Sequence, residues 1–245
     1  MFWSGASITH LPNSSMFKRV FVLFSDHELP RLAHIEAIRE VFPELEIIKP
    51  VFPAYEHVPF LDALIEKSES RTGKALLATE IGVILSHRKI WAIIAKEKSE
   101  EHFLVMESDS RISNKERLGD ALAKKYDLFF WGAWNGYVSL KRSTIINGIG
   151  EPLINSVYGA YGYSLNAKAA KYLLKKTVRI AYPVDLYKHT IDTSELKLGS
   201  IVPEVITTWR TTDSSIRSES KWHLVKFELI RLLFYCRNTI QSYFC

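Results

Sequence analysis

The sequence is poor in cysteine and has no long apolar run, and each shortage excludes a class of protein. Only Cys236 and Cys245 are cysteines, so neither a disulfide framework nor a cysteine-rich metal site can be built. A reducing compartment is the simplest expectation. No run of about 18 apolar residues is available to span a bilayer, and residues 1–16 lack the basic-then-apolar pattern of a signal peptide. We therefore expect a cytoplasmic protein.

Internal repeats and Gly/Ser-rich linkers are also lacking, which favours a single domain. A chain of 245 residues is close to the roughly 250 residues that one hydrophobic core supports. The 47% hydrophobic and 24% charged fractions exclude wholesale disorder and fibrous classes. We expect an N-terminal arm over 1–16, one domain over 17–220, and a separate C-terminal segment over 221–245.

The charge excess is small and concentrated near the C-terminus. The formal net charge is +5, which favours an anionic partner such as a nucleotide. Residues 221–245 contain four basic residues against the single acid Glu228. Because the rest of the chain is nearly neutral, the sequence argues against a broad nucleic-acid surface.

The apolar pattern predicts an α/β fold with a mainly parallel sheet flanked by helices. Short apolar runs of this kind are typical of buried strands, and residues 53–79 are expected to be irregular. Strands are predicted at Val20–Phe24, from Glu46, at Phe103–Met106, within Asp127–Trp134 and at Tyr158–Leu165. Helices are predicted at Arg31–Val41, from an N-cap at Ser86, and over Ala167–Lys176 after an N-cap at Asn166. On such sheets ligands bind beyond the carboxyl ends of the strands.

The first candidate site is Glu107-Ser108-Asp109, directly after a predicted buried strand. Two carboxylates one residue apart can place oxygens around a hard divalent cation. A cation there would neutralise charge on a departing diphosphate. The alternative is an ordinary acidic turn after a strand.

The second candidate is the stretch from Glu80 to His87. A glycine beside a helix start, here Gly82, offers backbone N–H groups to an anion, and Glu80 could accept from ribose hydroxyls. The alternative reading is structural: Ser86 caps a helix, Gly82 forms a turn, and His87 is an ordinary surface or core histidine.

In combination these motifs resemble glycosyltransferase family 25, the lipooligosaccharide and lipopolysaccharide sugar transferases. The resemblance rests on an ordered set from about residue 18 to about residue 217. The set comprises Glu80-Ile81-Gly82, Leu85-Ser86-His87, Trp91, Glu107-Ser108-Asp109, Tyr158 to Leu165, Tyr182-Pro183-Val184-Asp185, Val202-Pro203 and Ser215-Ile216. It implies a GT-A type α/β fold, a UDP-sugar donor, a Mn²⁺ or Mg²⁺ cofactor and inversion at the anomeric carbon.

The resemblance also implies roles for individual residues. Glu107 and Asp109 are the expected metal ligands, and Asp185 is the expected base or acceptor-binding residue, with a helix N-cap as its alternative. The expected donor-binding residues are Ser25, Arg31, Glu80, Gly82, Ser86, His87 and Ser108. Ser108 stands where the family usually has a second acid, which leaves the site one carboxylate short. Arg31 has a surface salt bridge as its alternative.

The expected partners are a nucleotide sugar and a glycolipid acceptor, and no nucleic acid. Galactose is the expected hexose, with glucose as its alternative. Trp131 and Trp134 are candidates for an acceptor groove, with the core as their alternative. The apolar and basic segment 221–245 fits three uses: a peripheral contact at the inner face of the inner membrane, packing on its own domain, or a homodimer interface. Two other functions stay open: a catalytically degenerate sugar- or nucleotide-binding protein, and a basic nucleic-acid module.

Overall fold

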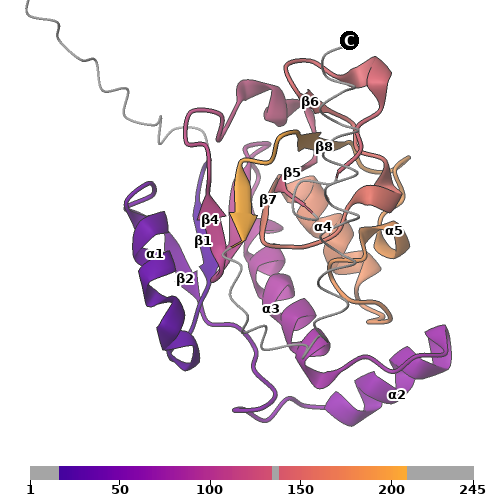
Figure 1. Cartoon of the computed structure of the whole chain (residues 1–245). Helices are drawn as coiled ribbons and strands as arrows, with labels where there is room; N and C mark the ends of the chain where they lie inside the picture. The colour runs from indigo at the N-terminus through magenta and orange to yellow at the C-terminus, as the bar shows by residue number, and fades with distance from the viewer. Residues whose placement is uncertain (1–16, 134–137, 209–245) are drawn as a thin grey trace, which may run out of the picture.

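The computed structural model describes residues 17–133 and 138–208, which form an α/β sandwich (Figure 1). The predicted arm 1–16, Trp134 and the C-terminal segment 221–245 lie outside the described residues. The strands are β1 Val20–Leu23, β2 Glu46–Ile48, β3 Phe103–Glu107, β4 Ser110–Ile112, β5 Leu128–Gly132, β6 Ile149–Gly150, β7 Gly162–Leu165, β8 Leu198–Ile201 and β9 Ile206–Thr208. The helices are α1 Leu32–Arg39, α2 Leu61–Thr72, α3 Ala78–Ile94, α4 Ala167–Lys176 and α5 Tyr187–Thr190, with short 3₁₀ turns η2 Asp26–Arg31, η3 Ala121–Lys125, η5 Arg142–Thr144 and η6 Ile154–Ser156.

Seven of these strands form one sheet in the order β2-β1-β3-β7-β5-β8-β6. Strand β1 pairs in parallel with β2 and β3, and β5 pairs in parallel with β8. Strand β7 lies antiparallel between β3 and β5, and β6 is antiparallel to β8. The prediction of a mainly parallel sheet is therefore confirmed in strand direction, with β7 and β6 as reversed members. The short pair β4-β9 forms a second sheet.

Both faces of the large sheet are buried, and each is covered by different helices. Alternate residues of a strand point to opposite faces, so Phe103 and Val105 pack with α3 and α4 in one cluster, whereas Leu104 and Met106 pack with α1 in the other. Trp131 belongs to the α1 side, is fully buried, and donates its Nε1 hydrogen to Ser164 at 2.9 Å. The expectation of an acceptor groove is therefore wrong for Trp131, which is a core residue.

Helix α2 contradicts the expectation that residues 53–79 are irregular. Its apolar residues Leu61, Leu64 and Ile65 pack against Ile81 and Ile84 of α3, so the segment gains its helical stability by covering a neighbour.

No helix in the described ranges is long and apolar enough to cross a bilayer.

Helix α3 begins at Ala78, eight residues before the predicted start at Ser86. Gly82 and Ser86 therefore lie inside the helix, and the expectation that Gly82 offers free N–H groups at a helix start is wrong. The Ser86 hydroxyl donates to the Gly82 carbonyl at 2.7 Å and accepts from the Val51 amide at 2.8 Å. Both residues serve to dock the chain segment after β2 onto α3.

Gly82 permits this docking because a side chain there would collide with the backbone. An added Cβ would lie 2.6 Å from the Val51 carbonyl oxygen and 2.7 Å from Cδ of Pro53. We predict that Gly82→Ala lowers the free energy of unfolding by about 1–3 kcal/mol, the usual range for overpacking, although alanine is the better helix former. Chemical denaturation checks this. Ala92→Gly, at an exposed position of the same helix, measures propensity alone, and a more stable Gly82→Ala variant would contradict the packing role.

Candidate active site

The acidic residues occupy a fixed turn at the carboxyl end of β3. Ser110, the first residue of β4, accepts a hydrogen bond from the Glu107 amide at 3.0 Å and donates one to the Tyr161 carbonyl oxygen. The turn Ser108-Asp109 is thereby held from both sides. Because β3 is paired on both edges by β1 and β7, the two carboxylates start from a rigid base.

Glu107 lies on the sheet face that α3 covers, and it meets His87 there. Its Oε1 is 3.2 Å from His87 Nε2, and the other ring nitrogen, Nδ1, is 2.8 Å from the Tyr163 hydroxyl. His87 is fully buried. Because both nitrogens are engaged inside the protein, the expected direct contact of His87 with a nucleotide is not supported.

Ser108 lies on the opposite face, where it meets the loop after β1. Its hydroxyl donates to Glu28 Oε1 at 2.7 Å and accepts from Arg31 at 2.7 Å. Arg31 also donates to Glu28 at 2.8 Å. The position that lacks an acid is therefore linked to a carboxylate supplied by η2, and Glu28 is a site residue that sequence reasoning missed.

Arg31 retains hydrogen-bonding capacity in this arrangement. Both of its contacts use the same terminal nitrogen, NH1, whereas a guanidinium carries five N–H donors in a fixed fork. Its side chain is 20% exposed. The salt bridge that the sequence left as an alternative is present, and it holds Arg31 beside the acidic turn with donors left for an anion.

The surroundings of Asp109 disfavour the charged form of its carboxyl group. Its Oδ1 is buried without a hydrogen-bond partner in the described part of the chain. Burial, and next the charge of Glu107, raise the pKa of the Asp109 carboxyl to about 7, with Arg31 opposing the rise and Glu28 adding to it. A carboxylate held among like charges gains from a nearby cation.

The acidic turn has carboxylates that could hold a divalent cation jointly with a phosphate-bearing ligand. Within the described residues no group of three His, Cys, Asp or Glu side chains is placed to hold a metal alone. Mg²⁺ and Mn²⁺ do not need such a cage, since they are commonly held by one or two carboxylates together with substrate phosphates. The orphaned Oδ1 of Asp109 beside Glu107 supplies that smaller donor set.

Asp185 lies on the loop before α5, and its charge and that of Glu107 act on the same tyrosine. Asp185 and Glu107 both contribute to the pKa of the Tyr187 phenol, which burial and the neighbouring Tyr163 raise well above its ordinary value. The N-cap residue of α5 is Leu186, whose side chain makes no capping hydrogen bond. Asp185 therefore lies one residue before the N-cap position that the alternative reading gave it.

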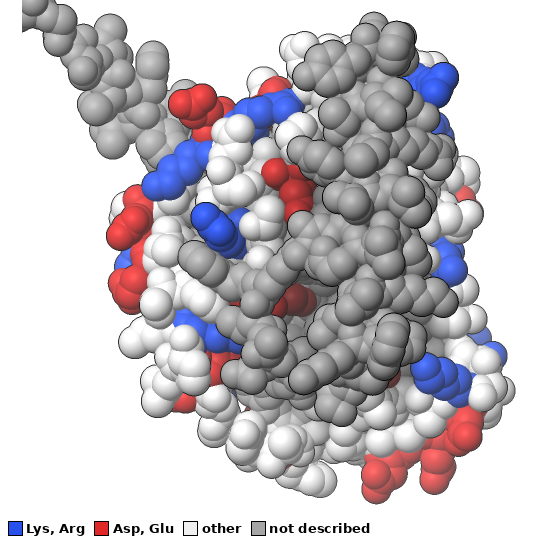
Figure 2. Space-filling view, in the orientation of Figure 1, with Lys and Arg blue, Asp and Glu red and all other residues white. Residues whose placement is uncertain are grey.

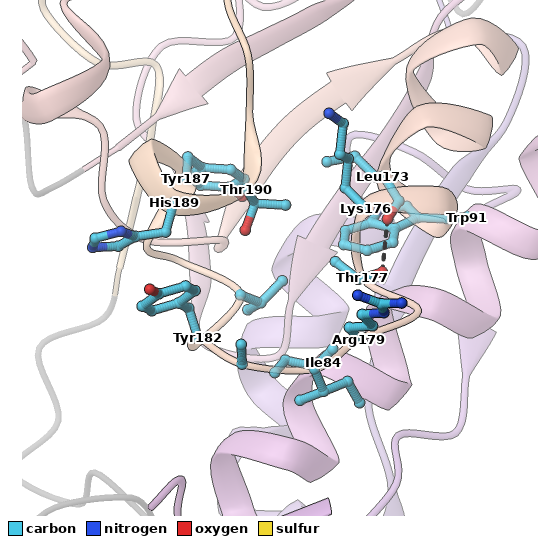
Figure 3. A pocket seen from close by; sticks show the side chains of 13 residues that line it. Ile84, Trp91, Leu173, Lys176, Thr177, Arg179, Tyr182, Tyr187, His189 and Thr190 are labelled. Atoms are coloured by element: carbon cyan, nitrogen blue, oxygen red, sulfur yellow. Dashed lines mark hydrogen bonds between the residues drawn. The ribbon is translucent and has the colours of Figure 1, made fainter. Parts of the chain in front are cut away.

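A pocket of about 110 Å³ lies between α3, α4 and α5 (Figure 3). Its walls also include the loop between α4 and α5, with Val184 and Tyr187, which precede and follow Asp185 in the sequence. Tyr182 and His189 are stacked with ring centroids 4.1 Å apart. Tyr187 is buried, and its hydroxyl has no hydrogen-bond partner among the described residues.

The remaining predicted donor-binding residues have structural contacts. The Ser25 hydroxyl caps η2 by accepting from the His27 amide at 3.2 Å. Glu80 accepts from the Leu77 amide at 2.9 Å, which satisfies a donor at the start of α3. From the predicted set, the structure brings Arg31 and His87 together with the acidic turn residues Glu107, Ser108 and Asp109.

An exposed aromatic pair near the same sheet edge was also missed. His27 stacks on Tyr55 with ring centroids 4.1 Å apart, and Tyr55 is 65% exposed. Phe52 contacts both rings edge-on. The three residues come from the loops after β1 and β2, and no sequence signal joins them because 25 or more positions separate His27 from the others.

The raised pKa of Asp109 makes a prediction for the metal-free protein. The pKa of Asp109 is about 7 in the folded protein and 3.8 ordinarily, so the unfolded chain loses this proton at lower pH. The free energy of unfolding therefore falls as the pH rises between these two pKa values. Asp109→Asn removes the penalty. We predict that it raises the melting temperature more at pH about 8 than at pH about 5. Asp62→Asn, at an exposed position, is the control; an equal gain at both pH values would contradict the prediction.

Comparison with protein-family models matches residues 55–188 to glycosyltransferase family 25 (LPS biosynthesis protein). The match covers more than half of the chain and contains the acidic turn, His87 and Asp185, whereas Ser25 and Arg31 precede it. A comparison with curated proteins finds no match. On the strength of the family match, this chain belongs to glycosyltransferase family 25.

Proposed function

We propose that this glycosyltransferase moves a hexose from a UDP-sugar to a lipooligosaccharide or lipopolysaccharide acceptor, with inversion at the anomeric carbon. The observation that carries the proposal is the buried Oδ1 of Asp109, which has no hydrogen-bond partner among the described residues, beside Glu107 at the carboxyl end of β3. Galactose is the hexose we propose. The order β2-β1-β3-β7-β5-β8-β6, with β7 reversed, supports our assignment of a GT-A type fold.

The donor diphosphate is proposed to lie between the acidic turn and Arg31. Glu107 and Asp109 would hold Mn²⁺ or Mg²⁺, which supplies charge neutralisation for the departing diphosphate. Arg31 contributes its unused N–H donors to the same oxygens, in the bidentate manner suited to phosphate. The exposed stack of Tyr55 on His27 is a suitable platform for the uracil ring, because aromatic faces stack on bases.

Asp185 is our candidate for the general base. In the proposed step the acceptor oxygen forms a bond to the anomeric carbon, and the bond from that carbon to the diphosphate oxygen breaks. The acceptor proton passes to the Asp185 carboxylate, and the bonding electrons leave with the UDP. Burial of the neighbouring Tyr187 and Trp91 limits water on this side, which favours transfer over hydrolysis.

The pocket lined by Val184 and Tyr187 is the acceptor position that we propose. Aromatic side chains suit sugar rings, and Tyr182, Tyr187 and Trp91 are among its walls. Among residues 17–133 and 138–208 no acidic side chain lines it, and Figure 3 shows the Arg179 guanidinium beside Thr177 while the Lys176 ammonium points away. Lys176 is paired with Glu195 at 2.9 Å. We propose that the acceptor hydroxyl meets Asp185, which follows the pocket residue Val184 in the sequence.

Figure 2 bears on the choice between a nucleotide sugar and a nucleic acid. On the visible part of the described surface, Lys and Arg are interspersed with Asp and Glu. A nucleic-acid module gathers basic residues on one face, and the visible described surface is not a face of that kind. Segment 221–245 lies outside the described residues, and its membrane, intramolecular or homodimer contact stays a prediction.

A sugar- or nucleotide-binding protein without turnover is the second candidate. Ser108, in place of an acid, favours it because the site has one carboxylate fewer on this turn. Release of UDP from a donor sugar in the presence of Mn²⁺ separates the two candidates, since a binding protein releases none.

Our first functional prediction concerns Asp109. Asp109→Asn should abolish detectable transfer and leave the folded state intact, because the residue follows β3 and its Oδ1 makes no hydrogen bond in the described chain. UDP release and circular dichroism measure the two effects. Treatment of the parent with EDTA should give the same loss. Full activity in either case would refute the metal assignment.

Our second functional prediction concerns Asp185. If it is the base, Asp185→Asn lowers the transfer rate by about 10²-fold or more, the scale for loss of a general base, while the affinity for UDP is unchanged. Single-turnover kinetics and UDP titration measure the two quantities. Asp62→Asn serves as the matched change on α2. Normal turnover per folded molecule in Asp185→Asn would remove the residue from catalysis.

A further inference from the structure

A buried hydrogen-bond chain leads from the core of the protein to the acidic turn. Trp91 Nε1 donates to the Tyr163 hydroxyl at 2.8 Å, that hydroxyl is 2.8 Å from His87 Nδ1, and His87 Nε2 is 3.2 Å from Glu107 Oε1. The first three side chains are each 1% exposed or less. Buried polar groups of this kind stabilise one arrangement when every member is satisfied.

The direction of the chain follows from what each group can donate. Indole N–H is a donor only, so the Tyr163 oxygen accepts from Trp91. Burial raises the pKa of the Tyr163 phenol well above its ordinary value, so the phenol keeps its proton and can donate it to His87 Nδ1. The remaining ring hydrogen then lies on Nε2 and points to the Glu107 carboxylate. The opposite tautomer would leave the Tyr163 proton without an acceptor and set two lone pairs against each other at Glu107.

Strand geometry explains why Glu107 alone of the turn receives this contact. Phe103, Val105 and Glu107 lie on the α3 side of β3, while Ser108 turns to η2. His87 lies on the face of α3 that packs onto the sheet, beside Ile90, Trp91 and Ile94. The contact with His87 therefore fixes the orientation of the Glu107 carboxylate through Oε1. The other oxygen, Oε2, is left for the proposed cation.

We infer that His87 is a positioning residue for the divalent cation, acting through Glu107, and that Tyr163 sets the ring tautomer that this role requires. The inference rests on the proposed metal-dependent function. A hydrogen bond from an outer group orients a ligating carboxylate and lowers the entropy lost when the metal binds. Removal of such a partner typically weakens metal affinity about 10–100-fold.

The chain supplies a matched control in His102. This histidine is also buried, and both of its nitrogens are bonded, Nδ1 to Ser164 Oγ at 2.9 Å and Nε2 to the Tyr126 carbonyl oxygen at 2.8 Å. It precedes β3, at the end of the strand away from the acidic turn. Its replacement disturbs the core without reaching Glu107.

The test is a Mn²⁺ titration in the presence of UDP, followed by electron paramagnetic resonance of the free ion, together with thermal unfolding of each variant. His87→Gln and Tyr163→Phe should weaken Mn²⁺ binding by about 10-fold or more, and His102→Gln should bind Mn²⁺ as the parent does even where its melting temperature falls. Tyr163→Phe removes only a hydroxyl group and keeps the His87 ring. It therefore tests the inference by itself if His87→Gln does not fold.

The outcomes separate this inference from the proposed function. Parent-like Mn²⁺ affinity in His87→Gln or in Tyr163→Phe would overturn the inference and leave the metal site standing. An equal loss of Mn²⁺ affinity in His102→Gln would show that the effect comes from core stability, and would also overturn the inference. A parent that binds no Mn²⁺ with UDP present would overturn the proposed metal site, and the inference with it.

Discussion

The burial of β3 on both faces is the constraint on which the site depends. Its residues from Phe103 to Met106 are fully enclosed between two hydrophobic clusters, and its edges are paired by β1 and β7. Fully burying one large apolar side chain contributes about 1.5–3 kcal/mol, so a shift of this strand would be costly. The strand therefore delivers Glu107, Ser108 and Asp109 to one place, and its alternation assigns Glu107 to α3 and Ser108 to η2.

That assignment gives the three residues of the turn different environments. Glu107 accepts from a buried hydrogen-bond chain, Ser108 links Glu28 to Arg31, and Asp109 is left buried with a raised pKa. The metal-free protein thus carries an electrostatic penalty at its proposed active site. Such a penalty is typical of functional sites, where stability is lower than packing alone would allow.

The sequence predicted the core elements well because their signals are local. The apolar run Phe103–Met106 and the Asn166 cap both lie where the structure has them, with Asn166 accepting from the Ala169 amide at 3.0 Å. It missed α2, whose prolines nearby suggested a loop, and it started α3 too late because Leu77, the N-cap, has no capping side chain. The pairs His87–Glu107 and Ser108–Glu28 could not be predicted, since they depend on which strand face meets which helix. Ser25, Gly82 and Ser86 were singled out by motif and prove to hold local structure.

The central claim is that the acidic turn of β3 supports sugar transfer from a nucleotide donor. The most direct test incubates the purified protein with a panel of nucleotide sugars, with Mn²⁺ or with EDTA, and measures nucleotide release. The account predicts release from at least one UDP-hexose in Mn²⁺ and none in EDTA. Absence of release from every donor, or release that EDTA leaves unchanged, would contradict it.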